Sequence, residues 1–230
     1  MDARTSGGPV TPRQGCPVEL NALWYYLLAY LELLALDAGD KEDARDWEKA
    51  RRLAGKSFNR CFWIEGERYL ADVWRPDGID RSMRPNMVIA AALELTPLSR
   101  GRRTDIVRHA RTELVTPRGL RTLAPHDPNY RGIYRGGPDE RDGAYHQGTV
   151  WPWLFGFFCE AYLRAYGPSP RRVRTVRRNL ERFADTLDGQ GLNHVSEVYD
   201  GDAPHNPGGT FAQAWNTAEL LRILALCREL

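Results

Sequence analysis

Apolar residues recur at three- and four-residue spacing along most of the chain, which is the period of α-helices. The first such segment, Val18 to Leu36, reads VELNALWYYLLAYLELLAL. Its apolar side chains crowd around the whole circumference, so we expect a well-buried helix with Pro17 in its first turn. The next segment, Lys41 to Phe58, is more amphipathic and carries its apolar residues along one face. An apolar helix is thus followed by an amphipathic one.

After the second predicted helix, the spacing of apolar residues shortens from three or four residues to two. The stretch CFWIEGERYLADVW alternates around Glu65-Gly66, which predicts a short β-hairpin. Two long polar segments, Thr116–Gly143 and Asp188–Thr210, exceed the length of simple connections and are candidates for site loops. Further helices are predicted at Pro85–Leu95, Ser99–Val115, Gln147–Tyr166, Ser169–Leu187 and Phe211–Leu230, which makes about seven helices in all.

Paired helices with long loops between the pairs indicate an all-α fold of the (α/α) toroid type. In a ring of helix hairpins the inner helices are covered on both sides, whereas the outer helices need only one apolar face. Long loops gathered at one rim can build a pocket. A four-helix bundle fits less well because its connections are short. About seven helices are, however, few for a closed ring.

Composition narrows the class of protein. The 230 residues suit a single domain, and the net charge of +2 gives no drive toward nucleic acid or a membrane surface. The arginine-rich stretch RRVRTVRR, residues 171–178, is better explained as a solvated face of an outer helix than as a nucleic-acid site. The four scattered cysteines and the absence of an apolar leader segment favour a soluble, cytoplasmic protein.

The common metal and cofactor motifs are missing from the sequence. No two of the five histidines are four residues apart, and there is no HExxH. The chain also lacks a phosphate-binding GxxxxGK[ST], a GxGxxG after a strand and a GxSxG elbow. We therefore expect no metal, no cofactor and no serine nucleophile.

The stretch RDGAYHQGTVWPWLFGFFCEAY, residues 141–162, joins hydrogen-bonding side chains directly to aromatic ones. A carbohydrate pocket needs both, because sugars present hydroxyl groups and flat apolar faces. Trp151 and Trp153 flank Pro152, so they point in different directions. Either one packs in the core while the other lines a pocket, or both are structural.

The segment NHVSEVYDGDAPHNPGGTFAQA, residues 193–214, gathers three carboxylates in one loop: Glu197, Asp200 and Asp202. One interpretation is turn chemistry, since Asp-Gly-Asp sequences are common in turns. The other is that Glu197 is a catalytic carboxylate on a rim loop. The spacing alone leaves both open.

Five segments in order resemble the glycogen debranching enzymes, in their C-terminal amylo-α-1,6-glucosidase domain. They are CPVELNALWYYLLAY, RPNMVIAAAL, TPRGLRTLAPHDPNYRGIYRGG, RDGAYHQGTVWPWL and SEVYDGDAPHNPGGTFAQAWNTAELLR, and they cover nearly the whole chain. The resemblance implies an (α/α)6 toroid of the six-hairpin glycosidase type. It also implies an inverting hydrolase that removes α-1,6-linked glucose from branch points of glycogen or limit dextrin.

The resemblance assigns roles to particular residues. Glu197 matches the general base, and Asp2 matches the general acid of a WMDA stretch. Pro207–Thr210 departs from the family, which has an Arg-Gly-Cys-like stretch there, so a basic residue near the base is lost. The positions that correspond to substrate-binding residues are Glu19, Asn21, Trp24, Arg84, Asn86, Arg121, Asp142, His146, Gln147, Trp151, Gln213 and Trp215. For Glu19 the alternative is a favourable charge at a helix N-terminus, and for the tryptophans it is core packing.

The position of Asp2 implies that residues 1–230 form a single partial catalytic domain, the C-terminal half of the toroid. A misplaced translation start, a truncated gene or a second chain with the missing N-terminal half would each explain it. Such a half exposes apolar surface at two edges, and Asp2 would fray, so we expect weak or no activity from the chain alone. The expected partner is an α-glucan. The alternative is a non-catalytic glucan-binding remnant, or a subunit that needs a partner half-domain.

Overall fold

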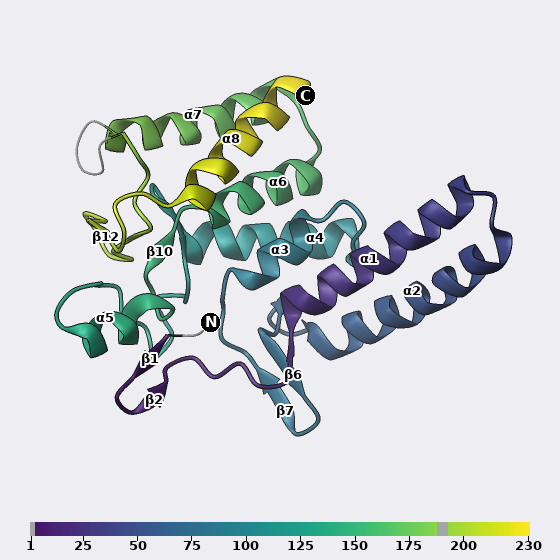
Figure 1. Ribbon diagram of the computed structural model, residues 1–230, viewed down its shortest axis with the longest axis horizontal. Helices are drawn as coiled ribbons and strands as arrows, with labels where there is room; N and C mark the ends of the chain where they lie inside the picture. The colour runs from purple at the N-terminus through teal and green to yellow at the C-terminus, as the bar shows by residue number, and fades with distance from the viewer. Residues whose placement is uncertain (1–2, 188–192) are drawn as a thin grey trace.

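The computed structural model describes residues 3–187 and 193–230, and it is mainly helical with several small sheets (Figure 1). A π-helical turn, η1 (Ala110–Leu114), extends α4. The helices are α1 (Val18–Asp37), α2 (Lys41–Phe62), α3 (Asn86–Ala92), α4 (Arg100–His109), α5 (Pro138–Tyr145), α6 (Leu154–Tyr166), α7 (Pro170–Leu187) and α8 (Ala214–Glu229).

The long helices pack in two rows. In the first row α1 packs against α3, α3 against α6, and α6 against α8. In the second row α2 covers α1, α4 covers α3 and α6, and α7 lies against α6 and α8. Every residue of α3 is buried because it lies in the middle of the first row. This alternation of first-row and second-row helices matches the predicted pairing of apolar and amphipathic segments.

The prediction that the first helix is buried all round is wrong. Helix α1 has α2 and α3 as its main neighbours, and the rest of its circumference is exposed. Trp24 is 54% exposed and Leu20 is 58% exposed. Helix α8 closes the other end of the row and also exposes apolar side chains, including Trp215 and Leu221. The expectation of exposed apolar surface at two edges is thereby confirmed.

Helix boundaries follow the sequence prediction at most ends. Helix α2 begins after Asp40, whose side chain accepts hydrogen bonds from the backbone N–H groups of Glu42 and Asp43. It continues four residues beyond the predicted end, to Phe62. The predicted hairpin is confirmed as β4 (Trp63–Ile64) paired with β5 (Tyr69–Leu70).

The prediction that the helix after the first loop begins at Gln147 is wrong. Helix α6 begins only at Leu154, and the residues before it contain the strand β10 (Val150–Trp151). This strand lies in the centre of a five-stranded antiparallel sheet of order β12-β11-β10-β9-β8. Its other strands are β8 (Val115–Thr116), β9 (Gly119–Arg121), β11 (Val198–Tyr199) and β12 (Pro207–Gly208).

The two polar segments, predicted as loops, therefore contain strands and a helix. The first also contains α5, which begins with Pro138 and carries Asp139 and Glu140 in its first turn. Residues 188–192 of the second segment lie outside the described residues.

Two further small sheets pair β1 (Arg4–Thr5) with β2 (Gly8–Pro9), and β3 (Cys16–Pro17) with β6 (Val73–Arg75) and β7 (Gly78–Asp80). Within the described ranges, no helix is both long and apolar enough to cross a bilayer.

Candidate functional site

The five-stranded sheet brings the two polar segments together. Val150 of β10 pairs with Tyr199 of β11 on one side and with Arg121 of β9 on the other. Glu197 directly precedes β11, and Tyr145 ends α5 a few residues before β10. The acidic loop and the polar-to-aromatic stretch thus lie side by side, although they are about fifty residues apart in sequence (Figure 1).

Three hydrogen bonds hold the carboxylate of Glu197. The hydroxyl of Tyr145 donates to Oε1 at 2.6 Å, and Nε2 of Gln213 donates to the same oxygen at 3.2 Å. The backbone N–H of Thr210 donates to Oε2 at 2.9 Å. Gly209 has a φ of +69°, and a Cβ atom there would overlap with Oε2. The half-buried carboxylate is therefore fixed from three sides.

Aromatic rings surround the side chains that hold Glu197. The ring of Tyr145 lies 4.9 Å from that of Trp151, and His146 stacks on Trp151 at an interplanar angle of 13°. The ring of Trp215 lies 5.9 Å from Trp151 and 5.7 Å from Trp153. Residues from the end of α5, from β10, from the residue before α6 and from α8 thus form one aromatic cluster.

This cluster forms one wall of a cavity of about 430 Å³. Both Trp151 and Trp153 line it, although Trp151 is only 5% exposed, so neither tryptophan is purely a core residue. We call it the tryptophan cavity. It is lined by Arg13, Glu19, Pro85, Asn86, Ile89, Thr122, His146, Trp151, Trp153, Leu154 and Trp215.

A largely buried ionic cluster contributes Arg13, Glu19 and Asn86 to the lining of the tryptophan cavity. Arg13 donates to Glu19 at 2.5 and 2.7 Å and to the Asp72 carboxylate at 2.7 and 3.1 Å. Nδ2 of Asn86 donates to Asp72 at 2.7 Å. Burial lowers the pKa of Arg13, but its hydrogen bond to Glu19 and the charge of Asp72 outweigh burial and raise that pKa above its ordinary value. Arg13 therefore stays charged and orients Glu19.

The comparison with known proteins concerns the chain as a whole and shows its family. The family described as Amylo-alpha-1,6-glucosidase matches residues 1–222. The chain belongs to the amylo-alpha-1,6-glucosidase family. A glycogen debranching enzyme from Saccharomyces cerevisiae is 27% identical over 272 aligned residues, which cover 95% of this chain. The chain spans only 17% of the length of that relative.

Solved structures of similar fold are also longer than this member of the amylo-alpha-1,6-glucosidase family. Neutral trehalase from Saccharomyces cerevisiae has a TM-score of 0.65 at 17% identity, over 93% of this chain and 39% of the trehalase. A GH63 mannosylglycerate hydrolase from Thermus thermophilus has a TM-score of 0.63 at 17% identity, over 91% of this chain and 46% of the hydrolase. At these identities the likeness shows the fold alone, which corresponds to part of a six-hairpin glycosidase.

Five of the substrate-binding positions implied by the family resemblance line the tryptophan cavity, and Gln213 contacts Glu197 beside it. Arg84 and Gln147 are buried outside the cavity lining. Arg84 donates to the carbonyl oxygen of His146 and to Oε1 of Gln147, both at 2.6 Å. Arg84, which is itself held by the side chain of Gln147, therefore fixes the backbone of His146. The five cavity-lining positions are Glu19, Asn86, His146, Trp151 and Trp215.

Other family-derived positions lie elsewhere. Asn21 donates to the carbonyl of Pro17 at 2.8 Å, and both Asn21 and Trp24 line a separate cavity of about 380 Å³ between α1 and α2. Arg121 donates to the carbonyl oxygens of Gly201 and Glu113, so it joins the acidic loop to the π-helical turn η1.

Asp142 and Asp2 are the remaining positions that the family resemblance assigns to the site. Asp142 is half-buried in α5 and is not among the residues that line the tryptophan cavity. Asp2, the expected acid, lies outside the described residues. Its neighbour Ala3 is 8% exposed and accepts a hydrogen bond from the backbone of Val10.

The three carboxylates of the acidic loop differ in their hydrogen-bond partners. Asp200 is buried and accepts from the backbone N–H of Tyr134 at 2.8 Å. Asp202 accepts from the hydroxyl of Tyr130 at 2.9 Å, and burial followed by this bond raises the pKa of Tyr130 to about 12. These two aspartates join the acidic loop to the segment around Tyr130 and Tyr134, which is a structural role but rests on contacts distant in sequence rather than on local turn bonds. Of the three, only Glu197 contacts residues of the aromatic cluster and of the segment that leads into α8.

Sequence reasoning missed Arg13 and Asp72. The sequence offered one signal for Asp72, because this charged residue lies between the apolar residues Ala71 and Val73. All three are buried in the structure. A charged residue at such a position needs a partner. The sequence gives no indication that Arg13, 59 residues away, is that partner.

Proposed function

We propose that this chain carries the base side of an amylo-α-1,6-glucosidase site, which hydrolyses α-1,6-linked glucose at branch points of glycogen or limit dextrin with inversion. The observation that carries the proposal is the ordered carboxylate of Glu197 beside the tryptophan cavity. Inverting hydrolysis requires a carboxylate that activates water and a second carboxyl group about 6.5–9.5 Å away that protonates the leaving oxygen.

The hydrogen bonds of Glu197 favour the role of base. Each oxygen of an ionised carboxylate accepts about two hydrogen bonds. Oε1 already accepts from Tyr145 and Gln213, whereas Oε2 accepts only from Thr210 among the described residues. Oε2 therefore has room to accept a proton from a water molecule.

The walls of the tryptophan cavity suit a glucose residue. Trp151, Trp153 and Trp215 offer apolar faces on which a sugar ring stacks. Glu19 and Asn86, which also line the cavity, offer hydrogen-bonding groups to its hydroxyls. Glu19 is paired with Arg13 and so acts as an acceptor rather than as the proton donor.

We assign the general acid to Asp2. The strands that follow it, β1 and β2, lie beside α5, and Ser6 donates two hydrogen bonds to Asp139 of that helix. The same helix ends in Tyr145, which holds Glu197. This connection between the start of the chain and the base supports the assignment.

The complete active protein is proposed to be an (α/α)6 toroid, of which this chain is the C-terminal part. The uncovered apolar faces of α1 and α8 support this, as does the coverage of less than half of each similar structure cited above. Burying one large apolar side chain contributes about 1.5–3 kcal/mol. A domain has only about 5–15 kcal/mol of total stability, so the missing half changes both stability and site order.

A second candidate function is a non-catalytic α-glucan-binding subunit that needs a partner half-domain. The two uncovered edges favour it, because they are the places where a separate chain would dock. In that case the tryptophan cavity binds glucan while hydrolysis depends on groups supplied by the partner.

Glucose release from limit dextrin distinguishes the candidates. We expect little or no glucose from the chain alone and efficient release when the preceding half of the domain is supplied, with β-glucose as the first product by NMR. Trehalose and maltose serve as control substrates and should be hydrolysed poorly. Full activity from the chain alone would contradict the need for a second half. Glucan binding without hydrolysis in both forms would favour the second candidate.

A further inference from the structure

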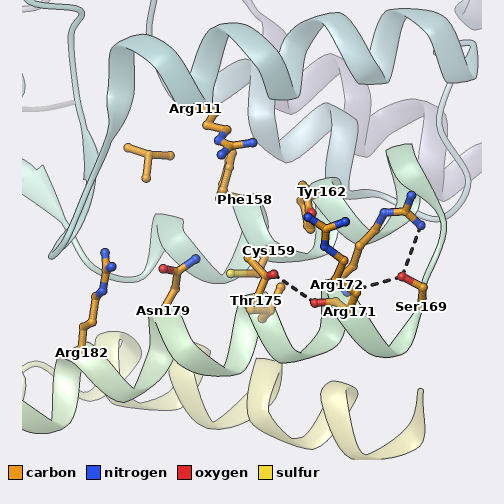
Figure 2. Close-up of a pocket in the computed structure, with 12 residues that line it drawn as sticks. Arg111, Phe158, Cys159, Tyr162, Ser169, Arg171, Arg172, Thr175, Asn179 and Arg182 are labelled. Atoms are coloured by element: carbon orange, nitrogen blue, oxygen red, sulfur yellow. Dashed lines mark hydrogen bonds between the residues drawn. The ribbon is translucent and has the colours of Figure 1, made fainter.

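A cavity of about 660 Å³ lies between α7 and the end of α4, over the middle of α6 (Figure 2). It shares no lining residue with the tryptophan cavity. Its floor is formed by Phe158, Cys159 and Tyr162 of α6. Figure 2 shows Arg111 extending from the helix on one side, while Arg171 and Arg172 extend from α7 on the other. We call it the arginine cavity.

Positive charge is concentrated in the arginine cavity. Four of its lining residues are arginines and none is an aspartate or glutamate: Arg111, Arg171, Arg172 and Arg182. None of these four forms an ion pair with a carboxylate among the described residues. Two other arginines at α6 differ, since Arg164 and Arg222 both bind Glu160 at 2.8 Å. The arginine cavity is thus an unbalanced cluster in a chain of net charge +2.

Backbone geometry places these side chains around one space. Arg171, Thr175, Asn179 and Arg182 follow each other at intervals of three or four residues, so they share one face of α7. Arg111 belongs to the π-helical turn η1, a feature that often occurs at functional sites. The expectation of a solvated helix face for residues 171–178 holds for their arginines, which are exposed except for the half-buried Arg172. Arg171 and Arg172 also line the arginine cavity.

The chemistry of the lining indicates the class of ligand. Guanidinium groups bind phosphate oxygens through paired, charge-assisted hydrogen bonds. Ser169, Thr175 and Asn179 add uncharged polar groups, and the α6 floor offers aromatic surface. The volume falls within the usual range for small-molecule sites, about 300–1,000 Å³. We propose that the arginine cavity binds a small organic phosphate, with Arg111 and Arg171 on the phosphate and the organic part on the α6 floor.

Calorimetry on the full chain at low salt tests this proposal. The probes are ATP, glucose 6-phosphate and inorganic phosphate, which separate nucleoside phosphates from sugar phosphates. We expect one organic phosphate to bind and to bind about tenfold or more weakly to the R111Q/R171Q variant, since tenfold corresponds to 1.4 kcal/mol. The matched control is R174Q, which removes an exposed arginine of α7 outside the cavity. Binding should also weaken as salt is raised.

Four results would overturn the proposal. The first is that no organic phosphate binds the wild-type chain. The second is that R174Q weakens binding as much as R111Q/R171Q does. The third is that inorganic phosphate binds as tightly as either organic phosphate, because the floor would then have no role. The fourth is that a single-stranded RNA binds more tightly than every small probe and depends equally on Arg174, which indicates a nucleic-acid surface. Equal melting temperatures by circular dichroism show that the variants fold. The titration of the wild-type chain tests phosphate binding even if a variant does not fold.

Discussion

At the scale of single residues, the proposed base depends on how tightly its surroundings hold it. The Glu197 carboxylate has hydrogen-bond donors from α5, from the loop before α8 and from the backbone of Thr210. Gly209 closes the remaining side, where a side chain would contact Oε2. Pro207–Thr210 is also where the sequence departs from its family resemblance. The departure therefore falls on a segment that packs directly against the base.

Gly209→Ala should displace the carboxylate of Glu197. Its φ of +69° disfavours alanine, and the added Cβ would overlap with Oε2. Such strain costs about 1–3 kcal/mol. If the displaced carboxylate raises the barrier by the same amount, kcat of the completed enzyme falls by about fivefold to 150-fold. Glucose release from limit dextrin measures the loss. Gly66→Ala is the control, because nothing lies within 4 Å of a Cβ there. Equal activity of the two variants would contradict the packing argument.

His109 should make stability depend on pH. Its Nε2 atom is buried without a hydrogen-bond partner among the described residues. Burial, followed by the nearby charge of Arg108, lowers the pKa of His109 below 6.5. The unfolded chain therefore binds this proton more readily than the folded chain, so stability is full above about pH 6.5 and falls as the pH drops below it.

Thermal melts at about pH 7.5 and pH 5.5 test this dependence. We expect the wild-type melting temperature to fall more on acidification than that of His109→Gln, whose side chain does not titrate. His126→Gln is the control, because His126 is exposed. An equal fall in wild type and His109→Gln would show that His109 does not contribute.

At the scale of elements, the long helices and the hairpin of β4 and β5 were predictable, whereas the strands of the five-stranded sheet were not. Helices α1, α2 and α7 carry enough turns for a three-to-four-residue period to show. Strands such as β10 and β11 have two residues each, too few to show alternation. Their pairing joins Val150 to Tyr199, which no local pattern reveals. The prediction therefore extended the helix at Leu154 back through β10.

The edge helix α1 should be the docking face for the missing half. Leu27 is 45% exposed on that face. Leu27→Lys should weaken assembly with the complementary half by at least about tenfold, because a charge would be buried there. It should change the melting temperature of the isolated chain little. Sedimentation of the mixed halves measures assembly.

Leu53→Lys on α2 provides the matched control, since Leu53 is 68% exposed and belongs to a second-row helix. It should leave assembly unchanged. If both variants assemble as the wild type does, the exposed face of α1 is not the contact surface.

At the scale of the whole molecule, the chain combines an ordered Glu197 and the tryptophan cavity with two uncovered helix faces, on α1 and α8. The resemblance in the sequence pointed to Glu197 and to five of the eleven residues that line the tryptophan cavity, because those residues lie in long, distinctive segments. Asn21 and Trp24, which it also pointed to, line the cavity between α1 and α2. The resemblance could not reveal the Arg13–Asp72 pair, since that contact joins segments whose approach depends on the tertiary fold. Local pattern thus predicts the elements, while the site depends on their assembly.

The central claim is that Glu197 acts as the base of an inverting glucosidase. The most direct test is Glu197→Gln in the chain supplied with its missing half, assayed for glucose release from limit dextrin and for glucan binding. Glutamine keeps the size and most hydrogen bonds of the side chain but cannot accept the proton of water. The account predicts that hydrolysis is abolished while glucan affinity stays within about twofold, well below a 1.4 kcal/mol change. Retained hydrolysis would contradict it.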